Sequence, residues 1–105
     1  TLWCAPTVDD REIWQVSMRH IAYEMRSFVI SACQFQPAST KVLGQRVTLR
    51  DRADDEPMIR GGTCIVSPFG EVLAGPLYDG EGLVVADICP ADIVRARFDL
   101  DISGH

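Results

Sequence analysis

The residues best suited to covalent chemistry are four cysteines, at Cys4, Cys33, Cys64 and Cys89. None of them takes part in the Cys-x-x-Cys or Cys-x-His spacing that a zinc site uses, so the sequence offers no metal motif. Each lies in an apolar run, which is typical of buried, reduced thiols. We therefore expect free cysteines and no metal site.

The two histidines give these thiols no general base. His20 lies on a predicted helix beside its apolar face, where a structural or surface role is the simpler interpretation, and His105 is the last residue. A cysteine becomes a nucleophile when a helix N-terminus or a neighbouring base lowers its pKa. No cysteine here has that setting, so the chain by itself assembles no active site.

Other polar residues also favour structural interpretations. Glu24 follows the apolar stripe of the same helix near its end, where we expect it to accept hydrogen bonds from nearby backbone. The pair Gly61-Gly62 enters a strand and lacks the Lys-Ser/Thr of a phosphate loop, so Gly62 is assigned to a turn or a close approach. Lys41, the only lysine, lies in a polar segment.

Length and composition exclude several classes of protein. The 105 residues, 47% of them hydrophobic, fit one globular domain. A net charge of −5, with no basic stripe, argues against a nucleic-acid partner. No apolar run approaches the roughly 18–20 residues of a membrane span, and no signal peptide pattern is visible. Reduced cysteines favour the cytoplasm.

The first half of the sequence predicts a strand, a helix and a strand. Residues 1–5 read as a short buried strand, and apolar residues recur at helical spacing over 10–26. Thr7 and Asp10 resemble a capping box before that helix. The continuous apolar run at 27–35 is typical of a strand covered on both faces.

The second half predicts a hairpin, a strand and a short helix. Residues 63–67 and 71–75 are joined by a tight turn, in which Gly70 supplies a positive φ. Residues 81–88 read as another buried strand, and 90–98 as a helix that begins at Pro90. The polar segment 36–60 is a long loop of the functional or interface kind. The fold class is α+β.

These strands need a layer that the chain does not supply. They are too apolar for either face to meet water, and two helices cover only one side of such a sheet. The chain also opens inside a predicted strand, which indicates a fragment. Exposed apolar faces and strand edges promote association, so we expect the isolated chain to form oligomers or aggregates.

Taken in order, the segments resemble the C-terminal portion of a nitrilase, within the carbon–nitrogen hydrolase superfamily. The resemblance rests on "CAPTVDDREIWQVSMRHIAYE", "FVISACQF", "GGTCIVSPFGEVLAGPLYDGEGLVVADI" and "ARFDLDISGH", which span nearly the whole chain. It implies that residues 1–105 form the C-terminal part of one hydrolase domain. The implied fold is half of a four-layer αββα sandwich, with no cofactor.

The resemblance also implies an activity, the hydrolysis of an organic nitrile to a carboxylic acid and ammonia. A cysteine attacks the nitrile carbon, a glutamate acts as general base and a lysine stabilises charge. All three precede the segment that "LWCAPT" resembles, so no catalytic residue is assigned in this chain. Pro6, Thr7 and Gln34 are implied to contact substrate. The implied partners are a small nitrile, the N-terminal half of the enzyme and further copies, as a dimer or spiral.

Two features depart from the nitrilase pattern, and two alternatives stay open. Met25 stands where the family has glycine, and the chain stops at Gly104-His105, before the usual aromatic-Arg-Pro-Asp continuation. One alternative is an inactive truncated product that serves only as a structural or oligomerising piece. The other is an amidase or carbamoylase of the same superfamily.

Overall fold

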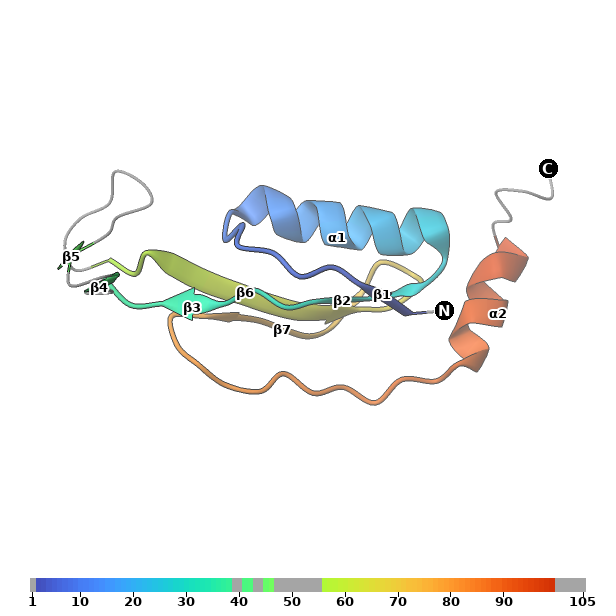
Figure 1. The fold of residues 1–105 in the computed structure, drawn as a ribbon. Coiled ribbons are helices and arrows are strands. Elements are labelled where there is room, and N and C mark those ends of the chain that lie inside the picture. Colours follow the sequence, from blue (N-terminus) through green and yellow to red (C-terminus); the bar gives the residue numbers. More distant parts are fainter. Residues whose placement is uncertain (1, 39–40, 43–44, 47–55, 100–105) are drawn as a thin grey trace.

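The computed structural model describes residues 2–38, 41–42, 45–46 and 56–99. One helix lies across a sheet and a second helix stands at the end of it (Figure 1), so the mixed α+β class is confirmed. The elements are β1 (Leu2–Cys4), α1 (Glu12–Met25), β2 (Phe28–Ser31), β3 (Phe35–Gln36), β4 (Lys41–Val42), β5 (Gln45–Arg46), β6 (Ile59–Val66), β7 (Val72–Tyr78) and α2 (Ala91–Asp99).

The long strand β6 organises the sheet. It pairs antiparallel with β2, β3 and β7, while β1 joins the far edge of β2 in parallel. The unit β1–α1–β2 is therefore a parallel crossover through a helix. β4 and β5 form a separate two-stranded ladder. The hairpin β6–β7 was predicted, but both strands are longer than the sequence indicated.

The start of α1 differs from the predicted capping box. The N-cap is Arg11, whose side chain makes no capping hydrogen bond. Thr7 Oγ1 accepts instead from the Asp9 amide at 2.9 Å. Asp10 is buried and accepts from the Arg60 amide at 2.8 Å. The carboxylate expected at the helix end is thus used to hold the start of β6 against the loop before α1.

The core lies between α1 and the sheet. Met18 and Ala22 of the helix pack on Val29, Cys64 and Val66, all of them buried. Burying the apolar stripe of an amphipathic helix in this way is the main source of its stability. The predicted burial of the second strand is confirmed here, since Phe28 and Val29 are each 1% exposed.

A chain of two hydrogen bonds ties three elements together above this core. Trp14 Nε1 donates to Ser31 Oγ at 2.9 Å, and Ser31 Oγ donates to the Ala5 carbonyl at 2.9 Å. The hydroxyl of Ser31 is fully buried and uses both its donor and an acceptor position. It therefore fixes α1, β2 and the segment after β1 relative to one another.

Two glycines hold backbone positions that side chains would disturb. Gly62 has φ +127°, and its carbonyl accepts a buried hydrogen bond from Gln15 Nε2 at 2.8 Å. Gly70 has φ +81° in the β6–β7 turn, where its amide donates to the Ser67 carbonyl at 2.9 Å. Both conformations favour glycine because they place a Cβ unfavourably.

Three burial predictions are wrong. Residues 81–88 form no strand, and Leu83 is 93% exposed. β1 forms as predicted, but Leu2 and Trp3 are about half exposed. All four cysteines are free, yet only Cys33 and Cys64 are buried, while Cys4 and Cys89 are exposed. In each case an apolar run was read as buried, although the described elements cover it only in part, as for β1, which pairs with β2 along one edge.

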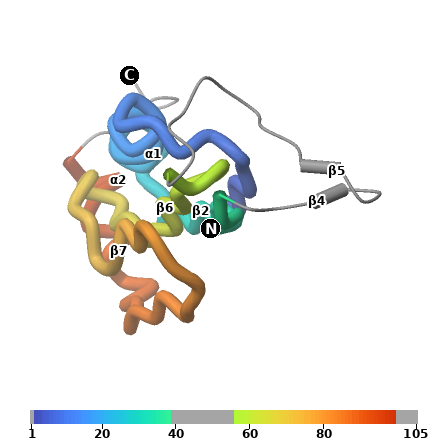
Figure 2. The backbone as a smooth tube through the Cα atoms, turned by 90° about the vertical axis from the view of Figure 1, so that its left-hand side faces the viewer, coloured from blue at the N-terminus to red at the C-terminus, as the bar shows by residue number. Residues whose placement is uncertain are grey.

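The segment 79–90 runs along the side of the sheet away from α1 and leads to α2, beyond the C-terminal end of α1 (Figures 1 and 2). α2 begins at Ala91, directly after Pro90, close to the predicted start. It does not cover the sheet as expected. Most of the polar segment 36–60, with the Lys41 side chain, and Asp101 and His105 lie outside the described residues. No described helix is long and apolar enough to cross a membrane.

Candidate functional site

The ends of β1 and β2 bring the predicted substrate-contacting residues to one edge of the sheet. The two strands are parallel, so their C-terminal ends meet at the same edge. Thr7 bridges Cys33, and the Thr7 amide donates to the Ala32 carbonyl at 2.9 Å. Pro6 and Thr7 therefore lie on the chain segment next to the one that carries Gln34.

A cavity of about 170 Å³ opens beside this edge. It reaches from the end of β2 across β6 to the residues after β7. Its lining residues are Cys33, Gln34, Phe35, Thr63, Leu77, Gly80, Glu81 and Gly82. Of the three residues predicted to contact substrate, Gln34 lines the cavity, whereas Pro6 and Thr7 do not.

The polar groups deep in this cavity hold the backbone. Thr63 Oγ1 accepts from the Cys33 amide at 3.0 Å and donates to the Cys33 carbonyl at 3.2 Å. The Cys33 thiol contacts the carbonyls of Asp9 and Gln34 at 3.8 and 3.7 Å. Thr63 thus fixes the chain at the end of β2 against β6. These hydrogen bonds also set the direction in which the chain continues to Gln34.

The buried thiols are poor nucleophiles. Burial raises the pKa of Cys33, and the nearby carboxylates of Asp10 and Asp9 raise it further. Burial also raises the pKa of Cys64, with a smaller contribution from Cys33. The thiolate is the reactive form of cysteine. Both groups therefore remain thiols at neutral pH, in line with their assignment as non-catalytic.

The far wall of the cavity was not predicted from the sequence. Leu77, Gly80, Glu81 and Gly82 come from the end of β7 and the segment after it. The available signal was the pair of glycines that flank Glu81, because glycines on both sides of a charged residue mark an exposed turn. That region was read as the start of a buried strand, which hid its position at the cavity.

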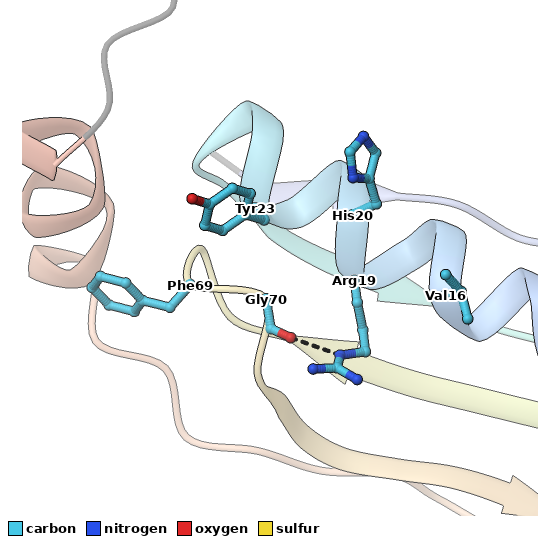
Figure 3. Close-up of a pocket in the computed structure, with 6 residues that line it drawn as sticks. All are labelled: Val16, Arg19, His20, Tyr23, Phe69 and Gly70. Carbon is cyan, nitrogen blue, oxygen red and sulfur yellow. Dashed lines mark hydrogen bonds between the residues drawn. The ribbon is translucent and has the colours of Figure 1, made fainter.

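A second hollow, of about 300 Å³, lies between α1 and the β6–β7 turn. Val16, Arg19, His20, Tyr23, Phe69 and Gly70 line it (Figure 3). Arg19 Nε donates to the Gly70 carbonyl at 2.9 Å, so its guanidinium supports the β6–β7 turn (Figure 3). This hollow shares no lining residue with the cavity at Gln34.

Glu24 lies near this second hollow, on the exposed side of α1. Its Oε2 is 2.9 Å from His20 Nε2, one helical turn earlier. The partner found is thus a side chain, where backbone donors were expected. Exposed pairs of this kind contribute little to stability. Among the described residues, no group of three His, Cys, Asp or Glu side chains is placed to hold a metal ion.

Comparison with known proteins gives matches along the whole chain. It is 49% identical to an aliphatic nitrilase from Sinorhizobium fredii and 48% identical to an arylacetonitrilase from Trametes versicolor, in each case over 99% of this chain. It is 45% identical, over 99% of its length, to a bifunctional nitrilase/nitrile hydratase from Lupinus angustifolius.

The chain spans about a third of the length of these relatives, 33% of the first two and 31% of the third. The family model described as carbon-nitrogen hydrolase matches residues 11–98, which run from the N-cap of α1 almost to the end of α2. This chain therefore belongs to the carbon–nitrogen hydrolase family.

Proposed function

We propose that this chain is the C-terminal part of a nitrilase that hydrolyses an organic nitrile to a carboxylic acid and ammonia. The observation that carries the proposal is the identity of 43–49% to relatives named as nitrilases, along 99–100% of the chain. The free cysteines suit a reducing compartment, and we place the enzyme in the cytoplasm.

The catalytic residues would lie in the N-terminal part of the same enzyme, outside residues 1–105, which we call the further polypeptide. The reaction begins when a cysteine of this further polypeptide attacks the nitrile carbon. The new S–C bond and a proton on nitrogen give a thioimidate. Water adds to its carbon, ammonia leaves, and a thioester remains. A second water cleaves the thioester, which releases the acid and restores the thiol. A glutamate moves the protons and a lysine stabilises the developing charge, and both also lie in the further polypeptide.

The chain would contribute half of a four-layer αββα sandwich. α1 covers one face of the sheet, and apolar side chains on and beyond β7 remain exposed, among them Val72, Leu73, Leu83 and Val85. Exposed apolar patches of this kind mark interaction surfaces. The N-terminal half of the enzyme would supply the second sheet over this surface, and further copies would extend the assembly to a dimer or spiral.

Residues 1–105 would contribute one wall of the substrate pocket to the active site. Gln34 lines the cavity and is exposed, so its amide is free to meet a substrate. Pro6 and Thr7 lie on the neighbouring segment and would complete the same rim once the second sheet is in place. The lining combines the apolar side chains Phe35 and Leu77 with the polar side chains Gln34, Thr63 and Glu81, so it would offer a small nitrile both apolar contact and an orienting amide.

The test is ammonia release from a nitrile. The complete polypeptide should be active, and residues 1–105 alone inactive. In the complete enzyme, serine at each of the four cysteines of this chain should preserve kcat. Gln34→Glu should lower kcat/KM about tenfold, the scale of one lost pocket contact. Asp92→Asn, on the exposed face of α2, is the matched control. Loss of kcat from one of these cysteine variants, with the fold intact, would contradict the proposal.

A substrate panel separates nitrile from amide hydrolysis. The matched family covers carbon–nitrogen hydrolases in general, so each nitrile is paired with the amide and the N-carbamoyl compound of the same side chain. We expect the nitrile to be turned over fastest. Faster turnover of the amide or carbamoyl compound would assign the enzyme to an amidase or carbamoylase. An inactive complete polypeptide would favour the structural alternative.

A further inference from the structure

Arg26 is a buried charge at the C-terminal end of α1. Its side chain is only 3% exposed. The residue forms the C-cap of the helix with φ +51°, and its amide donates to the Ala22 carbonyl. The guanidinium lies against the Tyr23 ring, with Cζ 4.2 Å from the ring centroid. The helix end thus turns a cation inward, where water cannot solvate it.

The described residues satisfy this cation only in part. Nη2 is 3.2 Å from Asp99 Oδ2, a single long contact to a carboxylate that is 70% exposed. Nε and Nη1 are buried and have no hydrogen-bond partner among the described residues. These two atoms carry three of the five N–H donors of a guanidinium.

Such a state is costly for a protein. Nearly all buried polar groups in folded proteins have a hydrogen-bond partner. A buried charge needs close pairing, because its lost hydration exceeds what one long contact returns. A guanidinium pairs best with a carboxylate, through two parallel N–H···O bonds. The unfilled donors of Arg26 therefore match a second carboxylate better than any neutral acceptor.

We propose that Arg26 is a docking site for a second carboxylate, carried by an Asp or Glu of the same polypeptide outside residues 1–105. In the complete enzyme this acidic side chain packs at the C-terminal end of α1 and binds Nε and Nη1, while Asp99 keeps Nη2. Arg26 then joins three pieces: α1, α2 and the segment that carries the acid. The proposal rests on the proposed function only for the existence of that further polypeptide.

Zero-length cross-linking identifies the acid. Arg26→Lys places an amine near the same carboxylates, and a water-soluble carbodiimide condenses an amine with an adjacent carboxylate to an amide. Lys41 is the only native lysine of residues 1–105, so few lysine links within this part of the polypeptide compete with those from position 26. Mass spectrometry of the complete polypeptide should show links from position 26 to Asp99 and to an acid outside residues 1–105. The wild type should show neither. Links only to acids within residues 1–105, such as Asp99, or no link at all, would overturn the proposal.

Mixing unlabelled and ¹⁵N-labelled Arg26→Lys protein before cross-linking identifies the source of the acid. A link within one polypeptide keeps both peptides in the same isotope state, as we expect. Links that join peptides of different isotope states would show that a second copy supplies the acid, and they would overturn the assignment to the same polypeptide.

Unfolding gives a readout that does not depend on activity. If the two donors stay unpaired, Arg26→Met removes a poorly paired charge, and the unfolding midpoint of the complete polypeptide stays level or rises. If a second carboxylate is bound, the same variant leaves that carboxylate buried and alone, and the midpoint falls.

We expect a fall, larger than that of Asp99→Asn, because Asp99 is exposed and supplies only one contact. Arg95→Met, which breaks the exposed pair with Asp92, is the control and should change little. A level or raised midpoint for Arg26→Met would overturn the proposal even if the enzyme hydrolyses nitriles. A lowered midpoint for Arg26→Met in a polypeptide that does not hydrolyse nitriles would support the docking site and contradict the proposed function.

Discussion

Two regions of the molecule have similar apolar content but opposite burial. In the packed layer, formed by α1, β2 and β6, Phe28 is 1% exposed and Met18 is 2% exposed. In the C-terminal arm, residues 79–99, Leu83 is 93% exposed and Phe98 is 94% exposed. The difference is not one of residue type. The packed layer has a helix to cover it, whereas most apolar side chains of the arm, with the exception of the buried Ala96, are left exposed by the described elements.

The comparison shows that an apolar run predicts that its side chains will be buried, but it does not predict which element will cover them. The crossover from β1 to β2 brings α1 onto the sheet by local connectivity, so the packed layer closes within the chain. The arm returns along the other side of the sheet and has nothing comparable. In the proposed nitrilase, the second sheet would cover the exposed apolar side chains of the arm. The predictions below test this contrast, from the largest expected effect to the smallest.

The largest contrast is expected from the same substitution in both regions. Phe28→Ala removes a fully buried ring and should cost about 3–5 kcal/mol of unfolding free energy. Phe98→Ala removes a ring that contacts mostly solvent and should change stability by less than about 0.5 kcal/mol. Denaturant unfolding of residues 1–105, at several protein concentrations to expose association, checks both values.

The complete polypeptide is the control for this pair. There the cost of Phe98→Ala should rise toward that of a buried ring if the arm is covered. A similar small cost in both settings would show that the arm is a solvated extension, and the proposed sandwich would lose its main physical support.

Glycines give the second contrast. A Cβ at Gly61, in β6, would lie 2.7 Å from the Leu77 carbonyl oxygen, and its φ is +95°. A Cβ at Gly80, in the arm, would meet nothing within 4 Å. Backbone strain and overpacking each cost about 1–3 kcal/mol, so Gly61→Ala should lose about 2–6 kcal/mol. Gly80→Ala should stay within about 0.5 kcal/mol. Equal losses would mean that the arm is as tightly packed as the sheet.

The sequence predicted the packed layer better than the arm. The helical spacing from Ile13 to Met25 predicts α1 close to where it forms, whereas the run at 27–35 forms the shorter β2, Phe28–Ser31, and ends in the separate strand β3. The run at 81–88 carries the same apolar signal but no strand. A strand requires a neighbour, and no pattern within one chain reports whether that neighbour exists.

The candidate site was predicted in the same uneven way. Gln34 was proposed from the nitrilase resemblance, near the end of a predicted strand, and the structure places it at a cavity. Glu81 was missed, because its place at the cavity depends on how the chain turns after β7. The buried donors of Arg26 were also invisible, since its sequence context at a helix end is that of an ordinary exposed arginine.

A third contrast concerns polar contacts. Gln15→Leu removes the buried hydrogen bond to the Gly62 carbonyl and leaves that acceptor unpaired, which should cost about 1–2 kcal/mol. Arg95→Leu breaks the exposed pair with Asp92 in the arm, 2.7 Å in length, and should cost only about 0.2–0.5 kcal/mol. Denaturant midpoints of the two variants should fall in that order. The reverse order would show that the arm depends on its polar contacts more than the packed layer does.

The smallest contrast needs no mutation, because the chain carries one thiol in the arm and one in the packed layer. At pH 8 an alkylating reagent should modify Cys89 at least tenfold faster than Cys64, which is buried and has a raised pKa.

The folded chain holds the Cys64 proton more tightly than the unfolded chain does. This contribution to stability is therefore complete below the ordinary thiol pKa of about 8.5 and is lost as the pH rises above it. Labelling of Cys64 should increase along the same pH range, when followed by mass spectrometry of the digested chain. In the complete polypeptide the alkylation rate of Cys89 should fall toward that of Cys64 if a second sheet covers the arm. A Cys89 that stays fast there would restrict the covered surface to residues before the arm.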